Sequence, residues 1–394
     1  MIKAEDPEHD RKPQLAQTIL ISAALLGGAA YVMTNASGRL ALLCLIGGAL
    51  GFALYHAAFG FTGAYRTAFQ SGRSGAVRAQ MLMLGVAVLV FFPILEAGQV
   101  LGQPVRGFVF PAGLELVLGA FLFGIGMQLG GGCASGTLYG AGGGDLRQMV
   151  TLIFFVVGMT LGAWDVERWA SLPALPPISL RESLGMWPAL GLNVAVLGLI
   201  ALWLSRREKR LTGKLEPLFR RRGMAVLTGP WALAWAALAL AMLNAATLVV
   251  AGRPWGITQA FATWGARLAE MSGIADPVFW PYWEDPTRID LLHRPLVQDG
   301  THLMNIGLIA GAFLAASLAG RFAPSFRVGF GPLIAAILGG LMLGYGARMA
   351  FGCNISAFFS GVASGSVHGW VWIMAALPGN WLGLQLRPVF GMKK

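Results

Sequence analysis

Charged residues are scarce in this chain of 394 residues, where Asp, Glu, Lys and Arg together make up 12%. A typical soluble domain has about 25%. Hydrophobic residues make up 56% and 55 positions are glycine, which excludes a soluble globular enzyme, a disordered chain and a disulfide-rich secreted scaffold. Apolar residues lie in runs of about 20, the length that crosses a bilayer as a helix. The composition therefore predicts an all-α polytopic membrane protein embedded in a lipid bilayer.

Motifs for cofactors and metals are also missing. The three cysteines, Cys44, Cys133 and Cys353, are too few and too far apart for a disulfide framework or a CxxC zinc pattern. The chain has no Walker A loop, dinucleotide fingerprint or HExxH motif, and its five histidines are scattered. We therefore expect a protein that is not an enzyme and that uses no cofactor or metal.

The formal net charge of +11 does not come with a soluble nucleic-acid-binding module. Basic loops are typical of the cytoplasmic face of a membrane protein, so we expect no nucleic-acid partner. Residues 1–13 are polar and lack an apolar core, so we expect no cleavable signal peptide.

Ten apolar segments predict ten membrane-spanning helices, with further short or re-entrant helices between them. The predicted spans are 15–36, 39–58, 77–95, 111–129, 147–164, 186–204, 229–251, 303–320, 330–349 and 367–386. They divide the chain into four parts: an N-terminal tail with the first span (1–38), a first transmembrane repeat (39–205), a basic cytoplasmic linker (206–228) and a second transmembrane repeat (229–394).

Basic residues predict the orientation of the chain in a bacterial inner membrane. With the N-terminus inside, 20 of the 29 Lys and Arg residues lie on the cytoplasmic side and 8 on the other. Positive residues collect in cytoplasmic loops, so we expect both termini in the cytoplasm.

An internal repeat relates the segments around Cys133 and Cys353, which lie 220 residues apart. At this offset three glycine pairs align: Gly119 with Gly339, Gly124 with Gly344, and Gly126 with Gly346. By the predicted orientation, the span before Cys133 and the span before Cys353 cross the membrane in opposite directions. This is the inverted-repeat plan of many transporters, although chance alignment of two Gly-rich helices remains the alternative.

The segments that contain the two cysteines are poor helices. Residues 130–144 include eight glycines, and residues 352–366 are small and polar. Non-helical backbone at membrane depth persists only where protein or a water-filled path satisfies its amides. We therefore expect re-entrant or broken helices there, and also at 60–72 and 256–273. Close packing of helices through small residues is the alternative.

The residues around each cysteine predict a site for a sulfur-containing anion. A helix start near the cysteine would present free N–H groups to an anion, and a thiol is a soft, weak donor suited to a sulfur atom. Cys133 and Cys353 would contact the sulfur. The donors expected to bind oxyanion oxygens are Gly132, Ser135, Gly352, Asn354 and Ser356.

The alternative is that each thiol is a small buried hydrophobic group, and this is what we expect for Cys44. Gln128 and Arg348 each lie five residues before a repeat cysteine and belong to the same candidate path. Arg348 would attract an anion, or else its long side chain would extend to the membrane interface or pair with a helix end.

Several stretches resemble signatures of the YeeE/YedE family of membrane transporters. They are GGGCASGTLYGAGGG, GCNISAFFSGVASGSVHGW and FTGAYR, while WGITQAFATWGARL and DPTRID are most similar to the YedE-type branch. The resemblance extends over roughly residues 40–390, and the block 352–370 is its most specific part. The family is associated with uptake of thiosulfate and related sulfur compounds, and one branch has been suggested to handle selenium.

The resemblance implies an hourglass-like bundle of inverted repeats whose short helices meet near the membrane centre. It also implies a central path of three cysteines that pass thiosulfate by transient S–H···S hydrogen bonds. Cys133 and Cys353 match two of them, but the third position, before FTGAYR, is Gly60 in this chain. Members often work beside a small cytosolic sulfur-carrier protein, for which the basic face at 206–222 is the expected contact.

We therefore expect a transporter that imports a small sulfur-containing anion, thiosulfate or a related sulfur or selenium compound, through a cysteine-lined path. Two alternatives stay open. Cys133 and Cys353 would form a membrane thiol/disulfide redox or sulfur-relay centre, or the chain would anchor a sulfur-transfer partner without transporting anything.

Overall fold

The ten predicted spans are all helices in the computed structural model, which describes residues 12–219, 226–324 and 328–393. These long helices are α1 (Leu15–Asn35), α2 (Gly38–Ala57), α4 (Gly75–Ala97), α5 (Leu114–Gly130), α7 (Leu146–Trp164), α10 (Met186–Thr212), α11 (Leu233–Ala251), α14 (Gly300–Leu318), α15 (Phe330–Met349) and α17 (Val367–Leu386). Residues 1–11 of the predicted tail and 220–225 of the predicted linker lie outside the described residues.

Short elements connect the long helices. The short helices are α3 (Phe61–Ser71), α6 (Ala134–Gly142), α8 (Glu167–Ala170), α9 (Leu180–Leu184), α12 (Thr258–Met271), α13 (Pro286–His293), the π-helix η4 (Asn354–Phe359), α16 (Ser360–Ala363), and the 3₁₀ turns η1 (Pro277–Phe279), η2 (Pro281–Trp283), η3 (Leu296–Gln298) and η5 (Arg387–Phe390). Two antiparallel ribbons pair β1 (Gln99–Val100) with β2 (Gln103–Pro104) and β3 (Ala112–Gly113) with β4 (Ala174–Leu175).

Polar residues and glycines mark the helix ends. The side chains of Ser37, Asp145 and Asp299 accept hydrogen bonds from the first turns of α2, α7 and α14, which satisfies N–H groups that have no partner within the helix. Gly72 follows α3 with φ +71°, a conformation that glycine adopts without strain. The breaks between spans are therefore encoded locally.

Within the described residues, nine helical stretches are long and apolar enough to cross a membrane. The predicted tenth span, α17, has 20 residues but is not among these nine. His368 and Asn380 reduce its apolar character and are fully buried in the protein. The chain is an all-α, multi-pass membrane protein.

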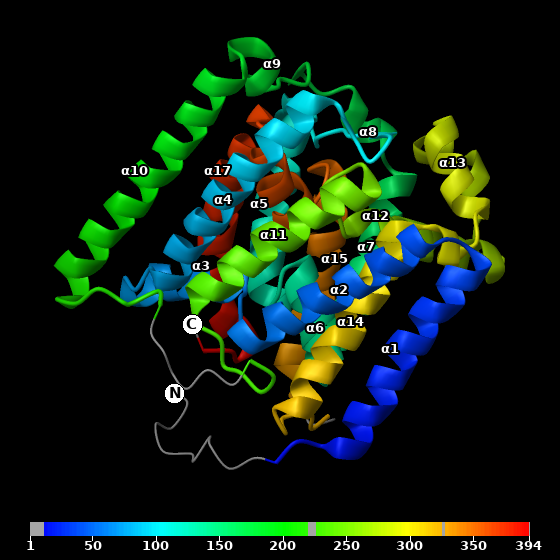
Figure 1. The fold of residues 1–394 in the computed structure, drawn as a ribbon, viewed down its shortest axis with the longest axis horizontal. Helices are drawn as coiled ribbons and strands as arrows, with labels where there is room; N and C mark the ends of the chain where they lie inside the picture. Colours follow the sequence, from blue (N-terminus) through cyan, green and yellow to red (C-terminus); the bar gives the residue numbers. More distant parts are fainter. Residues whose placement is uncertain (1–11, 220–225, 325–327, 394) are drawn as a thin grey trace.

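Two of the nine stretches, α1 and α10, lie at the periphery of the bundle (Figure 1). Only 11% of the apolar window of α1 and 22% of that of α10 are buried inside the protein. Their large apolar side chains are exposed, among them Leu20, Leu26 and Leu199. Such surfaces suit contact with lipid tails. Helix α10 continues through Thr212, beyond the predicted end of its span at 204.

Apart from α1, α10, the short helices α8, α9 and α13 and the 3₁₀ turns, the helices repeat one order, α2–α3–α4–α5–α6–α7 and then α11–α12–α14–α15–η4/α16–α17. Their packing is reciprocal under this equivalence. Helix α2 packs on α14 as α11 packs on α4, and α7 packs on α15 as α17 packs on α5. Helices α5 and α15, and likewise α2 and α11, pack on each other across the centre.

Close glycine contacts show how α5 and α15 are related. A Cβ at Gly126 would lie 2.9 Å from the Gly339 oxygen, and a Cβ at Gly346 would lie 2.6 Å from the Gly119 oxygen. These contacts exchange under the 220-residue offset. A residue near the start of α5 therefore meets one near the end of α15, so equivalent helices run antiparallel, as an inverted repeat requires.

A buried ion pair joins α10 to the repeat. The Arg78 guanidinium lies 3.0 Å from the Glu208 carboxylate, with side chains 7% and 1% exposed. Glu208 also accepts hydrogen bonds from the Ser74 hydroxyl and the Glu216 N–H. This carboxylate therefore holds α4, α10 and the following segment together.

We expect Arg78→Leu to lower the free energy of unfolding by about 3 kcal/mol, because it leaves the Glu208 charge buried without its partner. Thermal unfolding of the detergent-solubilised protein measures the change. Arg73→Leu is the matched control, since Arg73 and Glu216 form an ion pair whose side chains are 56% and 30% exposed and such pairs contribute little. Equal loss of stability in the two variants would contradict the prediction.

Candidate functional site

Each of the four segments predicted to be re-entrant or broken contains a short helix, and two of these helices start at the repeat cysteines. Cys133 is the N-terminal cap of α6 and Cys353 is that of η4. Helix α3 starts after Gly60 and α12 after Ile257. Each start presents N–H groups that are unsatisfied within the helix. All three cysteines of the chain are buried free thiols, and Cys44 packs in an apolar cluster, as expected.

The two repeat cysteines lie at breaks that reach the middle of the bundle from opposite ends. Helix α5 ends where Gly130 packs on Gly339, halfway along α15. Helix α15 ends where Met349 packs on Gly119, within α5. Because the two helices are antiparallel, the Gly-Cys segments that follow them face opposite ends of the protein.

The local geometry fixes the Cys353 thiol. The Cys353 N–H donates to the Ser356 hydroxyl at 3.0 Å, and the Cys353 Sγ accepts from the Ile355 N–H at 3.4 Å. Gly352 has φ +144°, and a Cβ there would lie 2.2 Å from the Ser356 Oγ. Glycine is therefore required before this cysteine.

Cys133 is held in a similar way. Its Sγ lies 3.4 Å from the Ser135 hydroxyl, and its carbonyl accepts from the Thr137 hydroxyl at 2.8 Å. A Cβ at Gly132 would lie 3.0 Å from the Thr137 nitrogen, so the chain passes too close at this point for a larger residue. Both thiols are buried beside hydroxyl groups, which suits an S–H donor.

A cavity of about 600 Å³, which we name the Cys133 cavity, opens beside α3 and α6. Gly60, Gly132 and Cys133 line it together with Arg66 and Tyr139. A Cβ at Gly60 would lie 3.1 Å from the Tyr139 hydroxyl. The structure thus brings Gly60 and Cys133, 73 positions apart in the sequence, to one cavity.

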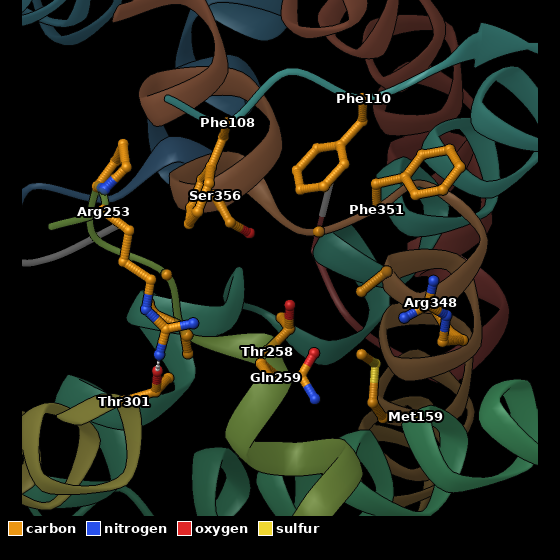
Figure 2. A pocket seen from close by; sticks show the side chains of 15 residues that line it. Phe108, Phe110, Met159, Arg253, Thr258, Gln259, Thr301, Arg348, Phe351 and Ser356 are labelled. Atoms are coloured by element: carbon orange, nitrogen blue, oxygen red, sulfur yellow. Dashed lines mark hydrogen bonds between the residues drawn. The ribbon is translucent and has the colours of Figure 1, made fainter. Parts of the chain in front are cut away.

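A smaller cavity of about 150 Å³, which we name the Arg348 cavity, lies beside α12 and η4. Figure 2 shows Arg253 and Arg348 on opposite walls, with Ser356 above and Gln259 below. Gly352 also lines it. None of the described residues that line this cavity is acidic. Glu115 acts on Arg348 from outside the lining, and the two guanidinium groups inside it favour an anion.

Aromatic and polar neighbours hold the two arginines. The Arg348 guanidinium lies 4.4 Å from the centre of the Tyr282 ring, an attractive cation–π contact. Its Nε is buried without a hydrogen-bond partner. Arg253 donates to the Thr301 hydroxyl at 2.8 Å.

The Arg348 cavity adjoins a vestibule of about 630 Å³, with which it shares Arg253 and Gln259. Arg39, Arg288 and Arg294 line the vestibule as well, and Asp299 is its acidic member. Asp299 is engaged in capping α14. Sequence reasoning missed these vestibule arginines, whose only signal was their position in loops beside spans.

Gln128, the repeat equivalent of Arg348, lines neither cavity and has a positioning role. Its amide donates to the Thr62 carbonyl and to Asn380, and its oxygen accepts from Arg66, which lines the Cys133 cavity. Arg387 donates to the Gln128 carbonyl. Gln128 therefore fixes the guanidinium of Arg66 at the cavity.

Three guanidinium groups gather at this end of α5. Arg147 donates to the Leu129 carbonyl, and cations are favourable at a helix C-terminus. Burial lowers the pKa of Arg387 to about 10, and repulsion from Arg66 and Arg147 contributes. The Cys133 cavity therefore has mainly cationic surroundings: Arg66 and Arg73 line it, and its acidic lining residue Glu216 is paired with Arg73.

The two cavities are equivalent under the inverted repeat. Residues of α3 correspond to those of α12 at an offset of 196, and residues around Cys133 correspond to those around Cys353 at the offset of 220. The lining residues of the two cavities then pair as follows: Gly60 with Gly256, Thr62 with Thr258, Gly132 with Gly352, and Gly136 with Ser356. Ser135, Asn354 and Cys353 line neither cavity and are buried in the wall between them. The predicted site residues thus form two chambers and the partition that separates them.

A model of the sulphur transport family matches residues 56–382 of the chain. Two relatives named "Thiosulfate transporter TsuA" match over most of their length. The Escherichia coli protein is 26% identical over 90% of this chain and 95% of its own, and the Spirochaeta thermophila protein is 28% identical over 86% and 96%.

A "Probable transporter YedE" from Salmonella typhimurium is 33% identical, but only over 41% of this chain and 39% of its own length. This match therefore spans about two fifths of the YedE protein. The YedE protein and both TsuA proteins are named as transporters.

Proposed function

The chain belongs to the sulphur transport family, and we propose that it imports a small sulfur-containing anion across the membrane. The anion is thiosulfate or a related sulfur or selenium species. The observation that carries this proposal is the pair of equivalent cavities: Gly132 and Cys133 line one, and Gly352, which precedes the buried Cys353, lines the other. This arrangement suits a substrate that passes between the cavities at the two thiols.

The residues suggest a sequence of events. The vestibule arginines and Arg348 draw an anion into the Arg348 cavity. Gly352 and Ser356 bound that cavity next to Cys353, and the buried Cys353 thiol meets the substrate sulfur. The anion then passes to Cys133 and enters the Cys133 cavity, where Arg66 balances its charge. No covalent bond forms, since an S–H···S hydrogen bond is made and broken at each thiol.

The basic segment 206–222 remains the proposed contact for a small cytosolic sulfur carrier, with both termini in the cytoplasm of a bacterial inner membrane. Helix α10 extends this face with Arg206, Arg207, Lys209 and Arg210 through its last two turns. Arg220, Arg221 and Arg222 lie outside the described residues.

Uptake of ³⁵S-thiosulfate by the purified protein in liposomes tests the proposal. We expect uptake above protein-free liposomes, saturating with thiosulfate concentration and inhibited by unlabelled thiosulfate more than by sulfate. Absence of uptake, with the protein correctly inserted, would contradict it and favour an anchor for a partner protein. A redox centre, the second candidate, requires a Cys133–Cys353 disulfide under mild oxidant, and free thiols after oxidation would remove it.

A further inference from the structure

Polar groups without partners are buried in the wall between the two cavities. Both amide atoms of Asn354 lack a hydrogen-bond partner, although the residue is 0% exposed. The hydroxyl of Tyr65 in the wall and that of Thr62, which lines the Cys133 cavity, also have none, and these side chains are 4% and 2% exposed. Buried polar groups are almost always hydrogen-bonded because leaving them unpaired is costly. A cluster of such groups therefore needs an explanation.

These groups belong to two short helices that meet at the wall. The Asn354 amide of η4 and the Tyr65 hydroxyl of α3 lie close enough to interact but not in the geometry of an ordinary hydrogen bond, and Cys133 lies beside the same hydroxyl. The rings of Phe61 and Phe358 from the same two helices pack edge to face, with centroids 6.4 Å apart. The unpaired groups thus lie beside the repeat thiols.

Comparison of the two halves shows that the fold does not need the polar groups of Tyr65 and Asn354. At equivalent positions of the other half, Tyr65 is replaced by Phe261 and Asn354 by Ala134. Both replacements are fully buried. The same backbone arrangement is therefore built with apolar side chains, at no cost in unsatisfied groups.

Tyr139 shows the same asymmetry. Its repeat equivalent is Phe359, and its hydroxyl lies at the Cys133 cavity near Gly60. Polar side chains with free hydrogen-bonding capacity therefore collect on the Cys133 side of the wall, and apolar side chains occupy the equivalent positions on the other side.

We propose that Tyr65 and Asn354 in the wall, with Tyr139 at the Cys133 cavity, form a hydrogen-bonding station for the oxygen atoms of the transported anion. The inference rests on the proposed function and specifies its substrate class as a sulfur anion that bears oxygen, such as thiosulfate. Phenol and amide groups donate to oxygen strongly and to sulfur weakly. A hydrosulfide ion, which has no oxygen, receives only the weaker hydrogen bonds to sulfur from them.

The absence of charge on the three station residues suits the passage of an oxygen-bearing sulfur anion. Tyr65, Asn354 and Tyr139 are neutral donors, so they bind an anion without holding it as an ion pair would. A path needs sites that bind well enough to admit the anion and weakly enough to release it. The arginines lie at the two cavities, whereas the station and the thiols offer only neutral groups to an anion that crosses the wall.

Tyr65→Phe and Asn354→Ala copy the residues of the other half and therefore keep the packing. We expect each to reduce thiosulfate uptake in liposomes about tenfold and to raise its KM, the effect of one lost hydrogen bond of about 1.4 kcal/mol. Hydrosulfide uptake should change less than about twofold, and thermal stability should be unchanged or higher. Tyr139→Phe should act in the same direction, and Tyr55→Phe is the matched control outside the cavities.

The outcomes are distinguishable. Thiosulfate uptake that is normal in all three variants would overturn the station and leave the proposed function standing. Equal losses for thiosulfate and hydrosulfide, with lower thermal stability, would assign Tyr65 and Asn354 a structural role and also overturn it. If the unmodified protein transports neither anion, the proposed function fails and the station fails with it.

Discussion

Gly51→Ala should destabilise the protein by about 3 kcal/mol, at the upper end of the usual cost of overpacking. A Cβ at Gly51 would lie 2.0 Å from the Leu308 carbonyl oxygen of α14, a backbone atom that cannot rotate away. Opposite it, a Cβ at Gly311 would lie 1.9 Å from the Gly48 oxygen. Helices α2 and α14 therefore touch through their backbones, and a single added methyl group would push them apart.

Gly85→Ala provides the matched control. Gly85 lies inside α4, and nothing is within 4 Å of the position of its Cβ. Alanine is favoured over glycine in a helix by about 1 kcal/mol, so this variant should be as stable as the parent or more so. Thermal midpoints of both variants in detergent, read by size-exclusion chromatography, give the comparison. Equal midpoints would show that the crossing tolerates the added methyl group.

The main features of the fold could be predicted because each membrane helix requires a long run of apolar residues in the sequence. Every predicted span is a helix, and the antiparallel contact of α5 with α15 confirms the inversion that the basic residues indicated. Helix α17 is less apolar than the other predicted spans, because its buried polar residues contact other helices. Hydropathy cannot distinguish such a helix from a less apolar surface segment.

The candidate site could be predicted only in part. Glycine and cysteine patterns identified both helix starts, because unusual residues are needed where a helix breaks at membrane depth. Which cavity or wall each of these side chains would face could not be predicted from the sequence. Ser356 lines the Arg348 cavity while its neighbour Asn354 faces the wall, and Tyr282 reaches Arg348 from a loop 66 residues away.

The inverted repeat also explains what local sequence could not show. Tyr65 and Tyr139 look like ordinary aromatic core residues when each is considered alone. Only superposing the halves reveals that Phe261 and Phe359 stand in their places, and that the difference is a pair of hydroxyl groups. Phe261 and Phe359 already suffice for the fold at these positions, so the two hydroxyl groups of Tyr65 and Tyr139 are candidates for function.

Cys133→Ala and Cys353→Ala should each lower thiosulfate uptake at least about tenfold, which corresponds to loss of one hydrogen bond of about 1.4 kcal/mol. Cys353 is 0% exposed and Cys133 is 1% exposed, so the substrate must meet each thiol within the protein. Alanine removes the S–H donor and leaves the helix start in place. In Cys353→Ala, the Ser356 hydroxyl still accepts the N–H of residue 353, which preserves most of the cap.

Cys44→Ala is the control, because Cys44 is equally buried but packs in a separate apolar cluster against α1 and α14. Its uptake should equal that of the parent. Cys→Ser variants separate the mechanisms further. A hydroxyl retains a donor but is a poorer partner for sulfur, so hydrogen-bonded passage predicts uptake between the parent and alanine variants. A redox relay predicts no activity with serine at either position, because serine cannot form a disulfide. Normal uptake in both alanine variants would exclude the thiols from the path.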